Sequence, residues 1–201
     1  MEIVGLDMEG VVVPEIWIAF AQASGIPALC RTTRDEPDYG KLMRWRLEVL
    51  RQHGLGLREI QATIGEIDPL PGARAFLDEL RALTQVVILS DTFMQFAMPL
   101  MRKLGLPTLL CNTLEVAPDG EITGFKMRIR DSKLATVRAL QSIGYDTIAA
   151  GDSYNDLDMI QASKAGFLFR SPENIREEYP ELPAYERYDE LLAAIRRNLT
   201  Q

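Results

Sequence analysis

The sequence of 201 residues has few cysteines and little positive charge. Its two cysteines, Cys30 and Cys111, are too few for a disulfide framework and lack the spacing of a cysteine-only zinc site, so both are excluded. The 22 lysines and arginines stand against 29 aspartates and glutamates, which leaves a net charge of −7. No run of basic residues offers a patch for a polyanion, and we therefore expect no nucleic-acid partner.

Long apolar segments are also missing. No stretch approaches the roughly 20 apolar residues of a membrane-spanning helix. The first ten residues carry Asp7 and Glu9 instead of the basic start of a secretory signal. The 14 glycines and 11 prolines are near average usage, which excludes collagen-like and low-complexity chains. We expect a cytoplasmic protein that has no membrane partner.

The segments that are present alternate between two periodicities. Short stretches rich in β-branched residues predict strands, and they are followed by stretches of helical spacing. The strand candidates are residues 2–7, 11–13, 85–90, 107–111, 147–151 and 165–169, and the helix candidates are residues 72–83, 93–104, 132–143, 155–162 and 188–199. This alternation predicts an α/β fold, a Rossmann-like parallel sheet flanked by helices.

Two stretches interrupt the alternation. Residues 14–71 contain helix candidates but no strand, and they are too long for a crossover connection. We interpret them as a small helical cap, inserted after the first strand into a core of residues 1–13 and 72–201; its helix candidates are 15–24, 39–52 and 57–65. Residues 114–129 carry a Pro118-Asp119-Gly120 turn between apolar positions, which predicts a β-hairpin insertion. Residues 171–183 are predicted to form a loop.

Acidic and hydroxyl residues gather where the predicted strands end. Asp7, Ser90 and Asp152 each close a strand, and Asp156 follows four residues after Asp152. Because ligands of parallel sheets bind at the carboxyl ends of strands, the three aspartates are expected to crowd one region. Their like charges then require a cation or a raised pKa, and an all-oxygen ligand set without histidine favours Mg²⁺. Alternatively, Ser90 or Asp152 taken alone is a helix N-cap.

The position of Lys133 is an independent indication of a bound anion. Asp131-Ser132 predicts an N-cap, which places Lys133 in the first turn of a helix, where its charge opposes the helix dipole. An anion bound there explains the placement, whereas the alternative is a solvated lysine at a surface turn. Phosphate is the anion that suits Mg²⁺, a lysine, a helix N-terminus and a serine hydroxyl together.

Asp7 is the only nucleophile beside the predicted metal. Its attack on phosphorus would form an acyl-phosphate. Glu9, two residues further on, would protonate the leaving oxygen and then activate the acceptor. The chain has no GxxxxGK[ST] motif, which excludes a P-loop.

These residues resemble the four ordered motifs of the haloacid dehalogenase superfamily of phosphotransferases. The matching segments are Asp7-Met8-Glu9-Gly10-Val11, Ser90, Lys133 and Gly151-Asp152-x-x-Asn155-Asp156. The insert resembles the cap of phosphoserine phosphatases, with Glu15 at its entry and with Tyr39 followed seven residues later by Arg46. Nearly the whole chain is similar to the bifunctional branch that moves phosphate from phosphoserine to homoserine, as the segments EGVVVPEIWIAFA, VVILSDTF and IAAGDSYND indicate.

The resemblance implies a role for each matched residue. Asp7 would be the nucleophile and a metal ligand, and Glu9 would be the acid/base and would give its backbone carbonyl to Mg²⁺. Asp152 would ligate the ion and Asp156 would support it. The substrate-binding residues implied are Glu15, Arg46, Ser90, Asp91, Lys133 and Asn155, with Glu15 and Arg46 facing the amino and carboxylate groups of phosphoserine. On the sequence alone, the interpretation of Arg46 is a solvated helix charge, and only the resemblance assigns it to the substrate.

Two residues depart from the common phosphoserine phosphatase pattern. Glu9 stands where an aspartate is usual, and Asp91 follows Ser90 where a glycine is usual. Both departures fit the bifunctional branch. The sequence does not rank hydrolysis against transfer to homoserine, and it leaves a monomer and a homodimer equally open.

Two other functions compete with this interpretation. One is a phosphatase of another small phosphomonoester with the same fold. The other is a receiver-like module that is merely phosphorylated on an aspartate. The long insert argues against the second, because a receiver needs an open phosphorylation site without a lid.

Overall fold

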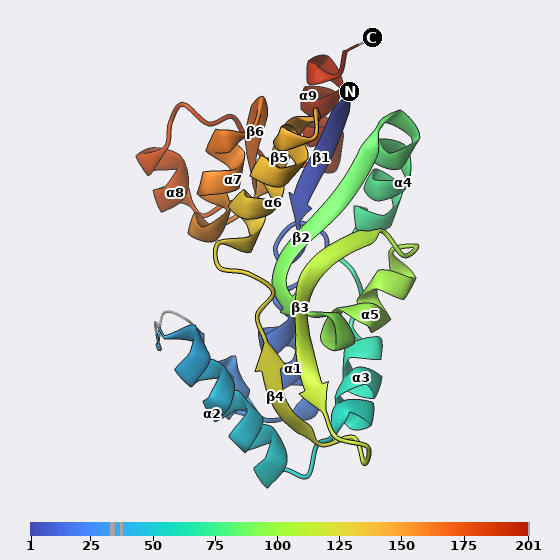
Figure 1. Cartoon of the computed structure of the whole chain (residues 1–201), viewed down its shortest axis with the longest axis vertical. Coiled ribbons are helices and arrows are strands. Elements are labelled where there is room, and N and C mark those ends of the chain that lie inside the picture. The colour runs from blue at the N-terminus through green and yellow to red at the C-terminus, as the bar shows by residue number, and fades with distance from the viewer. Residues whose placement is uncertain (33–34, 37, 201) are drawn as a thin grey trace.

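The structure is a computed structural model that describes residues 1–32, 35–36 and 38–200. A sheet of seven strands in the order β4-β3-β2-β1-β5-β6-β7 forms its centre (Figure 1). The strands are β1 (Glu2–Asp7), β2 (Gln85–Phe93), β3 (Thr108–Val116), β4 (Ile122–Lys126), β5 (Asp146–Gly151), β6 (Ala165–Phe169) and β7 (Ala184–Tyr185). Neighbouring strands are parallel except for the antiparallel pair β3–β4. The predicted α/β class is confirmed.

Helices cover both faces of the sheet. One face packs on α4 (Ala73–Leu83), α5 (Met94–Lys103) and α9 (Tyr188–Asn198), and the other on α6 (Ser132–Ser142), α7 (Leu157–Ala162) and α8 (Glu173–Glu178). The two apolar clusters meet at β1, whose Val4 and Leu6 face the first layer while Ile3 faces the second. Because β1 is buried along its whole length between β2 and β5, the position of its last residue, Asp7, is fixed at the carboxyl end of the central strand.

Helices also fill the insert that follows β1. Its elements are α1 (Ile16–Ser24), the 3₁₀ helix η1 (Pro27–Cys30), α2 (Tyr39–Gln52) and α3 (Leu57–Gly65). The Asp38 side chain caps α2 by accepting a hydrogen bond from Lys41 N at 2.9 Å. The β3–β4 hairpin lies beside these helices (Figure 1), and its turn accepts a hydrogen bond from Leu57 N to Gly120 O at 2.9 Å. The division into a core and a cap of residues 14–71 stays a prediction, and the hairpin packs with the insert.

Two local predictions around the site were wrong. Residues 11–13 do not form a strand: Val12 N and Val13 N both donate to Met8 O, at 2.9 and 3.0 Å, in a tight turn that Gly10 opens with a φ of 77°. Ser90 does not close β2, because the strand continues to Phe93 with a register irregularity against β3. The β-branched run is thus used to bury a turn under the insert.

Two further predictions need correction. The stretch predicted as a loop, residues 171–183, contains α8, which the buried side chain of Ile175 anchors to the sheet. Asp131 lies before α6 in the left-handed region, with a φ of 48°, and its side chain makes no capping hydrogen bond. The start of α6 is therefore stabilised by contacts other than the predicted Asp131 cap.

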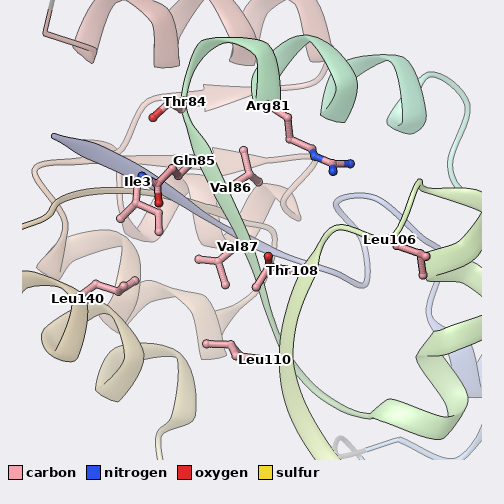
Figure 2. A pocket seen from close by; sticks show the side chains of 10 residues that line it. All are labelled: Ile3, Arg81, Thr84, Gln85, Val86, Val87, Leu106, Thr108, Leu110 and Leu140. Carbon is pink, nitrogen blue, oxygen red and sulfur yellow. The ribbon is translucent and has the colours of Figure 1, made fainter.

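A cavity of about 480 Å³ opens at the amino ends of β1, β2 and β3. Figure 2 shows its mostly apolar lining, with Ile3, Val87 and Leu110 from the strands and Leu140 from α6. The acidic residues predicted to carry the chemistry lie at the opposite side of the sheet, near the carboxyl ends of β1, β2 and β5. In the described part of the chain, no helix is long and apolar enough to cross a membrane.

Candidate active site

A buried cluster of charges lies where β1 ends. Lys133 Nζ lies 2.8 Å from Asp7 Oδ1 and 2.6 Å from Asp156 Oδ1. The three side chains are 5%, 6% and 0% exposed, in the order Lys133, Asp7, Asp156. Two carboxylates therefore share one ammonium group out of contact with water, which leaves the cluster with an excess of negative charge.

Asp152 adds a third carboxylate to this cluster. One carboxylate oxygen from each of Asp7, Asp152 and Asp156 lies within 4.8 Å of the other two. The approach is close because glycines line it: a side chain at Gly10 would run into the Asp152 carboxylate, and one at Gly151 would run into Asp156. The two glycines thus leave room between the strand ends for the carboxylates.

The crowding shifts the acid–base properties of the cluster. Burial and then the charge of Asp156 raise the pKa of Asp7 well above its usual value, although Lys133 opposes them. The same two causes raise the pKa of Asp152 to about 7. Burial by itself lowers the pKa of Lys133, but Asp7 and Asp156 outweigh it and raise the pKa overall. A divalent cation with oxygen ligands would relieve this excess of negative charge, so the donor set fits Mg²⁺.

Asp156 organises the turn that follows β5. Its Oδ2 accepts hydrogen bonds at 3.1 Å from Asp152 N, Ser153 N and Ser153 Oγ. Its Oδ1 accepts from Lys133, so both carboxylate oxygens are engaged by donors of the protein. Asp156 therefore fixes the backbone that presents Asp152.

Glu9 lies between the cluster and the insert. Its Oε1 accepts a hydrogen bond from Ile16 N, the first residue of α1, at 2.7 Å. Burial and then the nearby charge of Glu15 raise the pKa of Glu9 to about 7. A carboxyl group with a pKa in this range can both donate and accept a proton near neutral pH.

Ser90, Asp91 and Asn155 lie around the same edge of the sheet. Ser90 is buried, and its Oγ accepts from Thr92 N at 3.2 Å. Asp91 Oδ1 accepts from Ser132 Oγ at 3.0 Å, and Asp91 Oδ2 accepts from Asn155 Nδ2 at 3.4 Å. Asp91 thus ties the end of β2 to the start of α6 and to the turn after β5.

Arg46 is buried, so the alternative of a solvated helix charge was wrong. Its guanidinium carbon lies 4.5 Å from the centre of the Trp17 ring, and its Nη2 donates to Arg31 O at 2.6 Å. Its Nε is buried and has no hydrogen-bond partner within residues 1–32, 35–36 and 38–200. Glu15 is exposed at the start of α1 and forms no ion pair with Arg46 among the described residues.

Three residues of this region were not predicted from the sequence as part of the site. Asn112 Nδ2 donates to Asp91 O at 2.8 Å, and Ser132 bonds the Asp91 side chain. Asn112 directly follows a predicted strand, so the strand-end rule that selected the aspartates could have found it. Trp17 had no such signal, because its contact with Arg46 joins two helices that only the tertiary structure brings together.

The chain thus combines a largely parallel sheet with an aspartate–lysine cluster at the carboxyl ends of its strands. The haloacid dehalogenase-like hydrolase family matches residues 2–164, and this chain belongs to that family. The chain is 53% identical over 191 residues to the phosphoserine phosphatase ThrH of Pseudomonas aeruginosa, covering 95% of this chain and 93% of that protein. It is 52% identical to a phosphoserine phosphatase of Pseudomonas syringae pv. tomato, covering 95% and 81% of the two chains.

A solved structure of a substrate-bound phosphoserine phosphatase complex has the same fold. It matches this chain with a TM-score of 0.75 at 21% identity, over 98% of both chains. A phospho-aspartyl intermediate analogue of phosphoserine phosphatase matches with a TM-score of 0.73 at 22% identity, over 92% of this chain and 93% of the other. At these identities the comparison shows the shared fold.

Proposed function

We propose that the protein is a phosphoserine phosphatase that also transfers the phosphoryl group of phosphoserine to homoserine. The observation that carries the proposal is the buried Asp7–Lys133–Asp156 cluster, with Asp152 close by, in a chain 53% identical to a phosphoserine phosphatase. The cluster combines a nucleophile, a cation for phosphoryl oxygens and an oxygen-only set of metal ligands.

The carboxylates of Asp7 and Asp152 and the backbone carbonyl of Glu9 would hold Mg²⁺, with Asp156 supporting them. When bound, the ion neutralises the carboxylates and polarises a phosphoryl oxygen.

Activity should fall at least about a hundredfold in EDTA and should return on addition of Mg²⁺, because the carboxylates otherwise repel one another and the incoming phosphate. Full activity in metal-stripped buffer would refute this ligand set.

The reaction divides into two displacements at phosphorus. The Asp7 carboxylate attacks the phosphorus atom, the bond from phosphorus to the seryl oxygen breaks, and Glu9 protonates that oxygen. Deprotonated Glu9 then takes a proton from water or from the homoserine hydroxyl, whose oxygen attacks the acyl-phosphate and frees Asp7. The pKa of Glu9, raised to about 7, supports both of its roles.

The remaining residues would bind the substrate. Ser90, Lys133 and Asn155 would hold phosphoryl oxygens, with Asp91 bonded to the Asn155 amide. The planar guanidinium of Arg46 would pair with the substrate carboxylate, and Glu15 with its ammonium group. The Nε of Arg46 has no acceptor within the part of the chain that the structure describes, which supports this role, because a buried donor without an acceptor is costly until a ligand supplies one.

Incubation with phosphoserine, with and without homoserine, tests the proposal. We expect inorganic phosphate without homoserine, and phosphohomoserine at the expense of inorganic phosphate when homoserine is present. Steady hydrolysis of p-nitrophenyl phosphate without turnover of phosphoserine would indicate a phosphatase of another phosphomonoester. Incorporation of a single phosphate per chain without turnover would indicate a receiver-like module.

A further inference from the structure

One buried polar side chain beside the site has no role in the chemistry described above. Asn112, on β3, is 1% exposed, and both ends of its amide are paired. Its Nδ2 donates to Asp91 O at 2.8 Å, and its Oδ1 accepts from Arg128 N at 2.8 Å. The partners fix the orientation of the amide, because a carbonyl oxygen can only accept and a backbone N–H can only donate.

The Asp91 side of this amide holds the irregular end of β2. Parallel pairing of β2 with β3 is regular up to Leu89 and resumes only at Phe93, which pairs with Asn112 itself. The intervening residues, including Ser90 and Asp91, are out of register with β3. The Asn112 amide donates to Asp91 O at 2.8 Å, a shorter hydrogen bond than the one that the same oxygen accepts from the Tyr39 hydroxyl at 3.4 Å. The amide thereby fixes the backbone that presents Ser90.

The Arg128 side of the amide holds the segment that leads into α6. The Arg128 Nη2 group donates to Thr136 Oγ1 at 2.9 Å and to Ser132 O at 3.5 Å, within the first two turns of α6. Ser132 Oγ in turn donates to Asp91 Oδ1 at 3.0 Å. The ring of hydrogen bonds is therefore closed, and it joins the end of β2 to the start of α6. Its four members are Asn112, Asp91, Ser132 and Arg128.

This ring lies between two groups that must act on one phosphoryl group. Ser90 precedes Asp91, and Lys133 follows Ser132, so each is one residue away from a member of the ring. We propose that Asn112 is a positioning residue, which holds Ser90 and Lys133 at a fixed separation so that both bind oxygens of the same phosphoryl group. The inference rests on the proposed phosphoryl transfer.

If Asn112 had a purely structural role, it would only pair with the backbone groups of Asp91 and Arg128. Its loss would lower the free energy of unfolding but would leave the turnover of the folded protein unchanged. A positioning Asn112 predicts a lower kcat in fully folded protein, because displacements of about 1 Å at reacting groups cost up to about a hundredfold in rate. The two roles therefore differ in kcat measured well below the melting temperature.

Two variants and one control separate these roles. Asn112→Leu keeps the approximate volume and removes both hydrogen bonds. Asn112→Asp keeps the acceptor for Arg128 N but places an oxygen against Asp91 O. Thr147→Val is the control: Thr147 is equally buried, at 2% exposed, and accepts a hydrogen bond from Gln141 Nε2 at 2.9 Å, but it lies at the amino end of the sheet. All are assayed with p-nitrophenyl phosphate, so the test does not depend on phosphoserine being the substrate.

We expect kcat to fall between about tenfold and a hundredfold in both Asn112 variants and to stay within about twofold in Thr147→Val. The loss in Asn112→Asp should shrink as the pH is lowered, because the protonated carboxyl can donate to Asp91 O, and the loss in Asn112→Leu should not change. Wild-type kcat in folded Asn112→Leu would overturn the proposal. Failure of both variants to fold would assign Asn112 to folding alone and would equally overturn it. Absence of phosphoserine turnover with these results intact would reject only the proposed substrate.

Discussion

Strand β1 carries a carboxylate at each end, and the two ends hold that charge in opposite ways. At the amino end, hydrogen bonds from the Thr200 hydroxyl and from Lys164 Nζ, the latter at 3.0 Å, lower the pKa of Glu2 to about 2. At the carboxyl end, burial and the charge of Asp156 raise the pKa of Asp7 well above its usual value. Both environments lie on one strand of six residues.

The difference separates stabilising charges from functional ones. Ionised Glu2 favours the folded state, because its partners bind the charged form. Ionised Asp7 disfavours the folded state, because one lysine serves a cluster of three carboxylates. The carboxyl end therefore costs stability and keeps charges that a metal ion and a phosphate would balance. Substitutions at the two ends should then have opposite effects on stability and activity.

The largest effect is expected at Asp7. Asp7→Asn should lower turnover of p-nitrophenyl phosphate by at least about a thousandfold, because the amide oxygen is a poor nucleophile. In metal-free buffer its free energy of unfolding should stay the same or rise, because the change removes a buried like charge at nearly constant shape. Steady-state kinetics and urea unfolding measure the two quantities. Substantial activity in a pure preparation would contradict the nucleophilic role, and a marked loss of stability would contradict the comparison.

A smaller and selective effect is expected at Arg46. Removing one side of a desolvated charge pair costs about 2–5 kcal/mol, and about 1.4 kcal/mol corresponds to a tenfold change. Arg46→Ala should therefore lower kcat/KM for phosphoserine by roughly thirtyfold or more and should change turnover of p-nitrophenyl phosphate by only a few-fold. Arg44→Ala, at an exposed position of the same helix, is the control and should leave both substrates unaffected. Equal losses on both substrates would assign Arg46 to folding or to the phosphate group.

Asp152 should show the cost of the site directly. Its pKa is raised to about 7 by burial and then by Asp156, so its ionised form destabilises the folded state above that pH. In metal-free protein at about pH 8, Asp152→Asn should raise the free energy of unfolding by about 1–3 kcal/mol, and the gain should fade as the pH drops below 7. Urea unfolding at several pH values measures this. A loss of stability at pH 8 would show that Asp152 is held by favourable contacts instead.

Much of this organisation could be predicted from the sequence. Buried strands and helical periodicity predict the α/β sheet, and strand-end polarity selects Asp7, Asp152 and the turn with Asp156, whereas Ser90 lies within β2 and not at its end. These signals are local, because each depends on a residue's place within a single element. The register irregularity of β2 between Leu89 and Phe93 arises in its pairing with β3, where Asn112 bonds Asp91 O, and no pattern within β2 alone predicts it.

Contacts between distant segments were beyond the same signals. Trp17 and Arg46 meet only when α1 and α2 pack, so the periodicity of α2 could not distinguish a buried arginine from a solvated one. Similarly, no sequence pattern indicated the hydrogen bonds at the amino end of β1, because Glu2 gains its partners from Thr200 and Lys164, nearly the whole chain away. Hydrogen bonds and ion pairs of this kind have no sequence motif, since they require only complementary partners that the fold brings together.

Glu2 provides the smallest expected effect and the counterpart of Asp152. Its pKa lies near 2 in the folded state and near the ordinary 4.5 in the unfolded state, so the unfolded chain binds more protons between these values. The stability that Glu2 contributes is therefore fully present above about pH 4.5 and is lost as the pH falls through 2. Glu2→Gln should lower the free energy of unfolding at neutral pH, and its difference from wild type should narrow on acidification.

The same variant should leave turnover unchanged, because Glu2 lies at the far end of β1 from Asp7. Urea unfolding at about pH 7, 4 and 3, with kinetics at neutral pH, tests both parts. Asp152→Asn and Glu2→Gln then form a matched pair, in which removal of one carboxylate stabilises an inactive protein and removal of the other destabilises an active one. If both variants shift stability in the same direction at neutral pH, the two ends of β1 do not differ as proposed, and the excess charge at the site is already compensated within the fold.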